Sequence, residues 1–159
     1  MSTHAGKEIY FSGGLGVADL ADKAAFEGLT WTRVNGIGEP FLEYGPNQDI
    51  SDFPTFSKVE KGLGTPDYGG GDIEVMRISG DAGQAAMKAQ GGKSSHGAFK
   101  IVLKDSTGTE TGDYTATTDY VKGVLTTPRR NAGQGGDMIL DIYGFGATQT
   151  ISVEPAVIA

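Results

Sequence analysis

The sequence predicts a mainly β fold, a sandwich or barrel-like scaffold with one short helix packed against it. Glycine accounts for 26 of the 159 residues, which favours turns and bulges over long helices. Several segments have the two-residue apolar period of a strand, and one Ala-rich stretch has helical spacing instead. A chain of this length can bury a core of its own without crosslinks, so we expect one domain.

Strands are expected where apolar, aromatic and β-branched residues gather. The clearest is 97–104, in which Phe99, Ile101 and Leu103 lie at alternate positions. Further strands are expected at residues 29–37, 41–44, 72–79, 113–125, 138–145 and 148–153. The β domain then covers residues 29–153, between an N-terminal arm (residues 1–28) and a C-terminal arm (residues 154–159).

One helix is expected between two of these strands, from Asp81 to Gln90. Asp81 and Gln84 form an approximate capping box at its start, and Gly91 ends it. A helix this short is marginal alone and must be held by tertiary packing. Small side chains would let it lie close against a sheet. The stripe that predicts this packing consists of Ala82, Ala85, Ala86 and Ala89.

A long polar segment, residues 46–71, precedes the helix and is expected to be mostly loop. A loop this long in a compact domain is usually functional or disordered. It nevertheless contains apolar side chains that a solvated loop rarely keeps, namely Phe53, Phe56, Leu63 and Tyr68. Two interpretations stay open: the loop folds over its own domain, or it packs on another subunit and hides its aromatic residues there.

Charge and composition exclude several classes of function. The formal net charge of −7 argues against a tight sequence-independent grip on nucleic acid. The absence of cysteine excludes disulfides, thiolate metal sites and a cysteine nucleophile. No apolar run reaches about 18 residues, so no membrane span is expected. Arg129-Arg130 is the only strongly basic dipeptide, and it is either solvated charge or a partner for the acidic rim of a neighbouring subunit.

No catalytic, cofactor-binding or metal-binding residues are predicted, and the chain is not expected to be an enzyme. Gly14 and Gly16 begin a dinucleotide-type glycine pattern, but Asp19 stands where its third glycine belongs. Residues 1–28 are therefore expected to be a flexible arm that orders on assembly. Both histidines, His4 and His96, are expected to be solvated. Carboxylates are plentiful, but no pair stands out as an acid–base couple.

Four stretches of the sequence resemble tail tube (major tail) proteins of bacteriophages with long, non-contractile tails. They are Asp67-Tyr68-Gly69, residues 73–76, the run from Asp81 to Ala89, and residues 98–101. Their order also matches: an aromatic-containing loop, a strand, an Ala-rich helix and alternating strands. The resemblance covers roughly residues 31–153, and its most specific part is the helix with its flanking strands.

The resemblance implies a β-sandwich with one flanking helix, self-assembled into hexameric rings that stack into a virion tail tube. Its partners would be further copies of itself, the tape measure protein inside the tube, and the tail terminator and tail-tip proteins. DNA would pass through the tube without tight binding, and the subunit would be made in the host cytoplasm. Contacts between rings would map to residues 46–71 and to both arms. Candidate self-assembly residues are Phe53, Phe56, Leu63, Tyr68, Arg129 and Arg130.

Two alternatives remain beside this interpretation. The first is a tube protein of a contractile tail or secretion system, which shares the tube architecture. The second, from a different class, is a carbohydrate-binding β-sandwich module. Such modules usually present several exposed aromatic residues on one face, whereas this chain has a single tryptophan.

Overall fold

The computed structural model describes residues 5–159, and in this range the chain forms ten strands and two helices. The mainly β prediction with a short flanking helix is confirmed, and a second, five-residue helix is added. The helices are α1 (Lys23–Glu27) and α2 (Ala82–Gln90). The strands are β1 (Glu8–Leu15), β2 (Thr32–Arg33), β3 (Tyr44–Asn47), β4 (Ile50–Pro54), β5 (Val59–Leu63), β6 (Asp67–Met76), β7 (His96–Val102), β8 (Thr118–Leu125), β9 (Arg129–Arg130) and β10 (Leu140–Val153).

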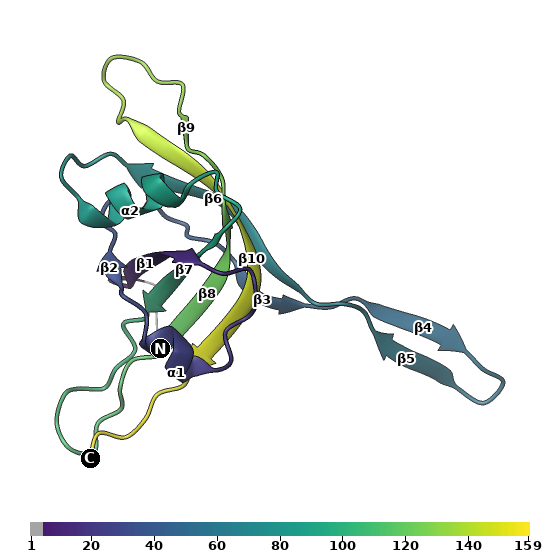
Figure 1. Ribbon diagram of the computed structural model, residues 1–159. Coiled ribbons are helices and arrows are strands. Elements are labelled where there is room, and N and C mark those ends of the chain that lie inside the picture. The colour runs from purple at the N-terminus through teal and green to yellow at the C-terminus, as the bar shows by residue number, and fades with distance from the viewer. Residues whose placement is uncertain (1–4) are drawn as a thin grey trace.

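Eight strands form one antiparallel sheet that curves into a barrel (Figure 1). Their order is β2-β1-β7-β8-β10-β6-β3, with β9 on a further edge of β10. The segment after β2 closes the barrel, because it hydrogen-bonds to β1 on one side and to β6 on the other. At one side the Val34 N–H donates to the Ile9 carbonyl at 2.9 Å, and at the other the Gly38 N–H donates to the Glu74 carbonyl at 2.7 Å.

Phe99 on β7 lies at the centre of the core and has no exposed surface. Its ring centroid is 5.1 Å from those of Phe11 and Phe145 and 5.6 Å from that of Phe41. These contacts have tilted or edge-to-face geometries, which aromatic pairs prefer. The aromatic cluster therefore connects β1, β7, β10 and the segment before β3.

Strand β1 corrects the prediction of an N-terminal arm over residues 1–28. It pairs with β2 on one side and with β7 on the other, so it belongs to the barrel wall. Ile9 and Phe11 point into the core, as the alternation of a half-buried strand requires. Residues 1–4 of the expected arm, with His4, lie outside the described residues.

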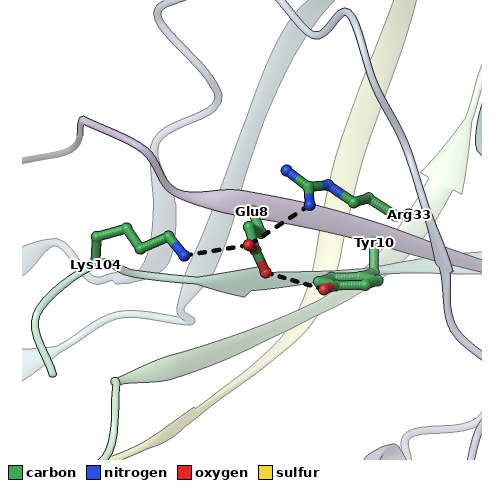
Figure 2. Close-up of polar contacts among 4 residues, drawn as sticks. All are labelled: Glu8, Tyr10, Arg33 and Lys104. Atoms are coloured by element: carbon green, nitrogen blue, oxygen red, sulfur yellow. Dashed lines mark hydrogen bonds and ion pairs between the residues drawn. The ribbon is translucent and has the colours of Figure 1, made fainter. Parts of the chain in front are cut away.

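The outward side chains of β1 take part in a polar cluster on the barrel surface (Figure 2). The Tyr10 hydroxyl donates to the Glu8 carboxylate at 3.0 Å, and Lys104 Nζ donates to the same carboxylate at 3.1 Å. Arg33 on β2 lies 3.5 Å from it. The Lys104 and Tyr10 hydrogen bonds hold the pKa of Glu8 below its ordinary value. The cluster thus links β1 to β2 and to the end of β7.

Helix α2 covers one side of the barrel through a different face from the one predicted (Figure 1). Gly83, Met87 and Gln90 are buried, whereas three of the four alanines are exposed. A Cβ at Gly83 would overlap the Arg33 carbonyl oxygen, so this glycine permits the close approach. The predicted cap is confirmed, because the Asp81 carboxylate accepts from the Gln84 N–H at 3.0 Å.

Two further segments differ from the sequence prediction. Strand β10 runs continuously where the sequence predicts two strands, and a register shift between Ala147 and Gln149 marks the place where they join. Beyond β10, Val157 forms a β-bridge with Tyr114 of the same chain. The C-terminal residues therefore lie against the segment before β8. Neither helix of the described residues is long and apolar enough to cross a membrane.

Candidate self-assembly surface

Residues 46–71 are not mostly loop, which corrects the prediction. Strands β4 and β5 pair in antiparallel register from Ile50–Leu63 to Pro54–Val59 and form a hairpin. Figure 1 shows this hairpin extending away from the barrel into open space. We call residues 48–66 the arm, which is distinct from the N-terminal and C-terminal arms predicted from the sequence. A two-stranded ribbon leaves its outer edges free, and that explains how β4 can contain a proline.

All ten strand residues of the arm are exposed, although several are strongly apolar. Phe53 and Leu63 are each 71% exposed, Ile50 is 67% exposed, and the ring of Phe56 at the tip is fully exposed. An isolated two-stranded hairpin is marginal in water, and its stability normally comes from packing on something else. The arm therefore presents apolar surface that nothing within the described chain covers.

The root of the arm is fixed to the barrel. The Tyr44 hydroxyl on β3 donates to the Asp119 carboxylate on β8 at 2.6 Å, and burial together with this hydrogen bond raises the pKa of Tyr44. Gly70 on β6 has a φ of +152°, and a Cβ there would overlap the Phe145 carbonyl oxygen. The glycine run therefore lets β6 approach β10 closely where the arm leaves the barrel. Tyr68 lies in this root and is half-buried.

Arg129 and Arg130 lie on β9, away from the arm, and both have acidic partners in their own chain. Arg129 Nη2 lies 2.6 Å from the Asp72 carboxylate, and Arg130 Nε lies 3.2 Å from that of Asp141. Both arginines are exposed, so these ion pairs contribute little to stability. The structure thus groups Phe53, Phe56 and Leu63 on the arm and separates the arginines from them. Pairing of the arginines with a neighbouring subunit stays a prediction.

A cleft of about 770 Å³ opens beside the root of the arm, and sequence reasoning missed it. Phe41 and Leu42 line it but are largely buried, and Lys7 Nζ lies 5.5 Å from the centre of the Phe41 ring, while Glu39 and Glu43 are exposed. Neither glutamate forms an ion pair within residues 5–159. The remaining lining residues are Lys7, Pro40 and Tyr44. The sequence predicts a strand at 41–44, and that pattern gives no sign of the cavity beside it.

His96 corrects a further prediction, because it is 4% exposed at the start of β7 rather than solvated in a loop. Its Nδ1 lies 3.1 Å from Nζ of Lys122, which is fully buried on β8. Lys122 Nζ also donates to the carbonyls of Ala18 (2.9 Å) and Val17 (3.3 Å). Burial, and then the charge of Lys122, lower the pKa of His96. Burial also lowers the pKa of Lys122, against the opposing charge of Asp19.

This buried pair fastens the segment after β1 to the barrel and has no nucleophile beside it. Thr148 Oγ1, the nearest hydroxyl hydrogen-bonded to His96, is 3.5 Å away and also donates to the Lys122 carbonyl. Within residues 5–159, no three His, Asp or Glu side chains are placed to hold a metal ion. Trp31 is not displayed for sugar stacking, because it packs against Tyr120 and its Nε1 donates to the Phe26 carbonyl.

Comparisons of the sequence with protein-family models and with characterised proteins give no match. The fold, in contrast, is shared with chains of known assemblies. One belongs to the cryo-EM structure of the PVC sheath/tube terminator of an extracellular contractile injection system in its extended state (TM-score 0.57, 13% identity, 92% of this chain and 93% of that one). Another belongs to the six-fold symmetrised baseplate of the anti-feeding prophage (TM-score 0.58, 9% identity, 96% and 97%).

Proposed function

We propose that this protein is a structural subunit of a phage-type tail tube, which self-assembles into hexameric rings that stack into a hollow cylinder. The observation that carries the proposal is the arm. It presents Phe53, Phe56 and Leu63 to solvent, although the barrel beside it buries its central aromatic residues completely. Large apolar surfaces of this kind mark places where another protein binds.

The shared fold supports the same conclusion. Its matches come from tail-like assemblies, one of them solved with six-fold symmetry, and each covers nearly the whole chain. A tube subunit needs a rigid wall and projecting contacts that complete themselves on neighbouring copies. The closed barrel would supply the wall, and the arm would supply the projecting contacts.

Charge fits a conduit for DNA. Six copies at −7 each carry a formal charge of −42, so the ring as a whole repels phosphate. A strongly basic wall would bind the DNA backbone and slow its passage. The tape measure protein, the tail terminator and the tail-tip proteins are the further partners that this function requires, and the location is the virion tail.

Negative-stain electron microscopy of the purified full chain over a range of concentrations tests the proposal. We expect rings, then stacked rings or tubes, as the concentration rises. A protein that stays monomeric and globular at millimolar concentration, at every ionic strength tried, contradicts the function.

The shared fold also favours a second candidate, a tube protein of a contractile particle, because one of the assemblies above is a contractile injection system. Cryo-EM of native particles that contain this chain separates the two candidates. A contractile particle has a sheath layer around the tube, whereas the tube of a long non-contractile tail is bare. The proposed role as a tube subunit is common to both candidates.

A further inference from the structure

We propose that the tip of the arm docks in the cleft at the arm root of a second copy of this chain. This inference rests on the proposed tube function and assigns the receiving site for the arm. The tip offers Phe53 and Phe56 without partners. The cleft offers a hollow in which Pro40 is exposed and Tyr44 is half-exposed, above Phe41 and Leu42, which are 8% and 9% exposed. The tip projects and the cleft is hollow, so the two are complementary in shape.

The arm cannot fill the cleft of its own chain. Phe56 lies nine residues beyond Asn47, the last residue of β3. At about 3.3 Å per residue, a ribbon of that length places its tip about 30 Å from the root. Five consecutive residue pairs hold the ribbon extended, and Figure 1 shows it directed away from the barrel. The side chains that enter the cleft must therefore come from another molecule.

The cleft is also large enough to receive the tip. A volume of about 770 Å³ lies within the range of roughly 300–1,000 Å³ that encloses whole ligands, so the cleft can take more than one aromatic side chain. Charges of both signs line the cleft (Lys7, Glu39 and Glu43) and the outer half of the arm (Asp52, Lys58, Glu60 and Lys61). The arm lysines pair with exposed acidic neighbours on the arm, and such pairs exchange partners at little cost, so the lysines can turn to the cleft glutamates on docking.

A contact from tip to root uses two different surfaces of the same chain. Each copy then gives one tip and receives another, so the contact repeats from molecule to molecule. Contacts of this heterologous kind close into rings or continue as open stacks. The docking therefore supplies one of the repeating contacts that a cylinder needs without a second type of subunit, and it explains why the apolar tip stands so far from the barrel.

Crosslinking is well suited to test this docking, because the natural chain contains no cysteine. One variant carries Ser57→Cys with Glu43→Cys, and a matched control carries Ser57→Cys with Gln134→Cys in the β9–β10 loop, so both keep the aromatic residues of the tip. After assembly and treatment with a short bis-maleimide, we expect the first variant to form a ladder of covalent oligomers and the control to stay mainly monomeric. Mixing the two single variants, Ser57→Cys and Glu43→Cys, should give covalent dimers only, because each chain then has one reactive end.

The outcomes separate this docking from the tube function. Rings or tubes that form without a crosslink between positions 57 and 43 overturn the docking and leave the tube intact. A chain that never assembles overturns both. Truncation gives an independent measure: Phe56→Ala should raise the concentration needed for ring formation by roughly 30-fold, as loss of an aromatic hot spot does. Met138→Ala, an exposed apolar change outside the arm, should leave that concentration unchanged, and an equal effect of both substitutions contradicts the docking.

Discussion

The barrel buries its large apolar side chains, whereas the arm exposes its own to water. In the barrel, Phe11, Phe26 and Phe99 have no exposed surface, and the sheet closes through the segment after β2. In the arm, each strand residue is exposed, and Phe53 and Phe56 have no neighbour to cover them. The barrel is therefore complete within one chain, whereas the arm lacks the packing partner that normally stabilises a two-stranded hairpin.

The largest expected effect on the free energy of unfolding comes from replacing a buried phenylalanine of the barrel by alanine, and the same replacement in the arm is the comparison. Phe99→Ala removes the ring that contacts Phe11, Phe41 and Phe145, so the free energy of unfolding should fall by about 3–5 kcal/mol. Phe56→Ala removes a ring with no packing partner and should change that free energy by less than about 0.5 kcal/mol. Urea unfolding of dilute, monomeric protein measures both values.

The comparison fails if the two variants are equally destabilised. Such a result would mean that the arm folds back on the barrel in solution. Far-UV circular dichroism of each variant before unfolding serves as the control, because it shows whether the β structure survives the substitution.

Lowering the pH should have a smaller effect on the free energy of unfolding, and this effect comes from the buried His96 of the barrel. Burial and the charge of Lys122 lower the pKa of His96 in the folded state below its unfolded value of about 6.5. Between these two values the unfolded chain binds more protons. Stability is therefore full above about pH 6.5 and falls as the pH drops from there towards the folded pKa.

His96→Leu removes this titration while keeping an apolar group in the buried site. The free energy of unfolding should then depend less steeply on pH just below about 6.5 than it does in the natural chain. Lys122 keeps the Val17 and Ala18 carbonyls as partners, so the variant is expected to fold. Identical slopes in denaturant titrations of both proteins would show that His96 does not titrate in this window.

The same contrast explains what the sequence can predict. Strand β7 is predictable because Phe99 and Ile101, two residues apart, pack on the core. Helix α2 is predictable from its N-cap at Asp81 and its end at Gly91, although the alanine spacing indicates the wrong face. Strands β4 and β5 have no core beneath them, so no period forms and the prolines and glycines suggest a loop. For the residues of strand β1 the sequence predicts a flexible N-terminal arm, because glycines follow their short apolar run.

Features made by distant segments are the hardest to predict. The burial of His96 depends on Lys122, 26 residues away, and on the segment around Val17. The cleft beside the arm root is a cavity between segments, so no residue pattern encodes it. The exposed aromatic residues, in contrast, can be recognised in the sequence as unusual for a loop, because Phe53 and Phe56 are side chains that a solvated segment rarely keeps.

A small effect on folding should also come from removing the arm itself. The Gly64 N–H donates to the Asp49 carbonyl at 2.7 Å, so an Asn-Gly turn can replace residues 50–63 and close the ribbon there. The barrel loses no buried side chain, and its free energy of unfolding should change by less than about 1 kcal/mol. Ring formation should be abolished, because the shortened chain has a cleft but no tip. A shortened chain that still builds tubes would place the essential contacts on the barrel wall, and one that fails to fold would make the arm part of the core.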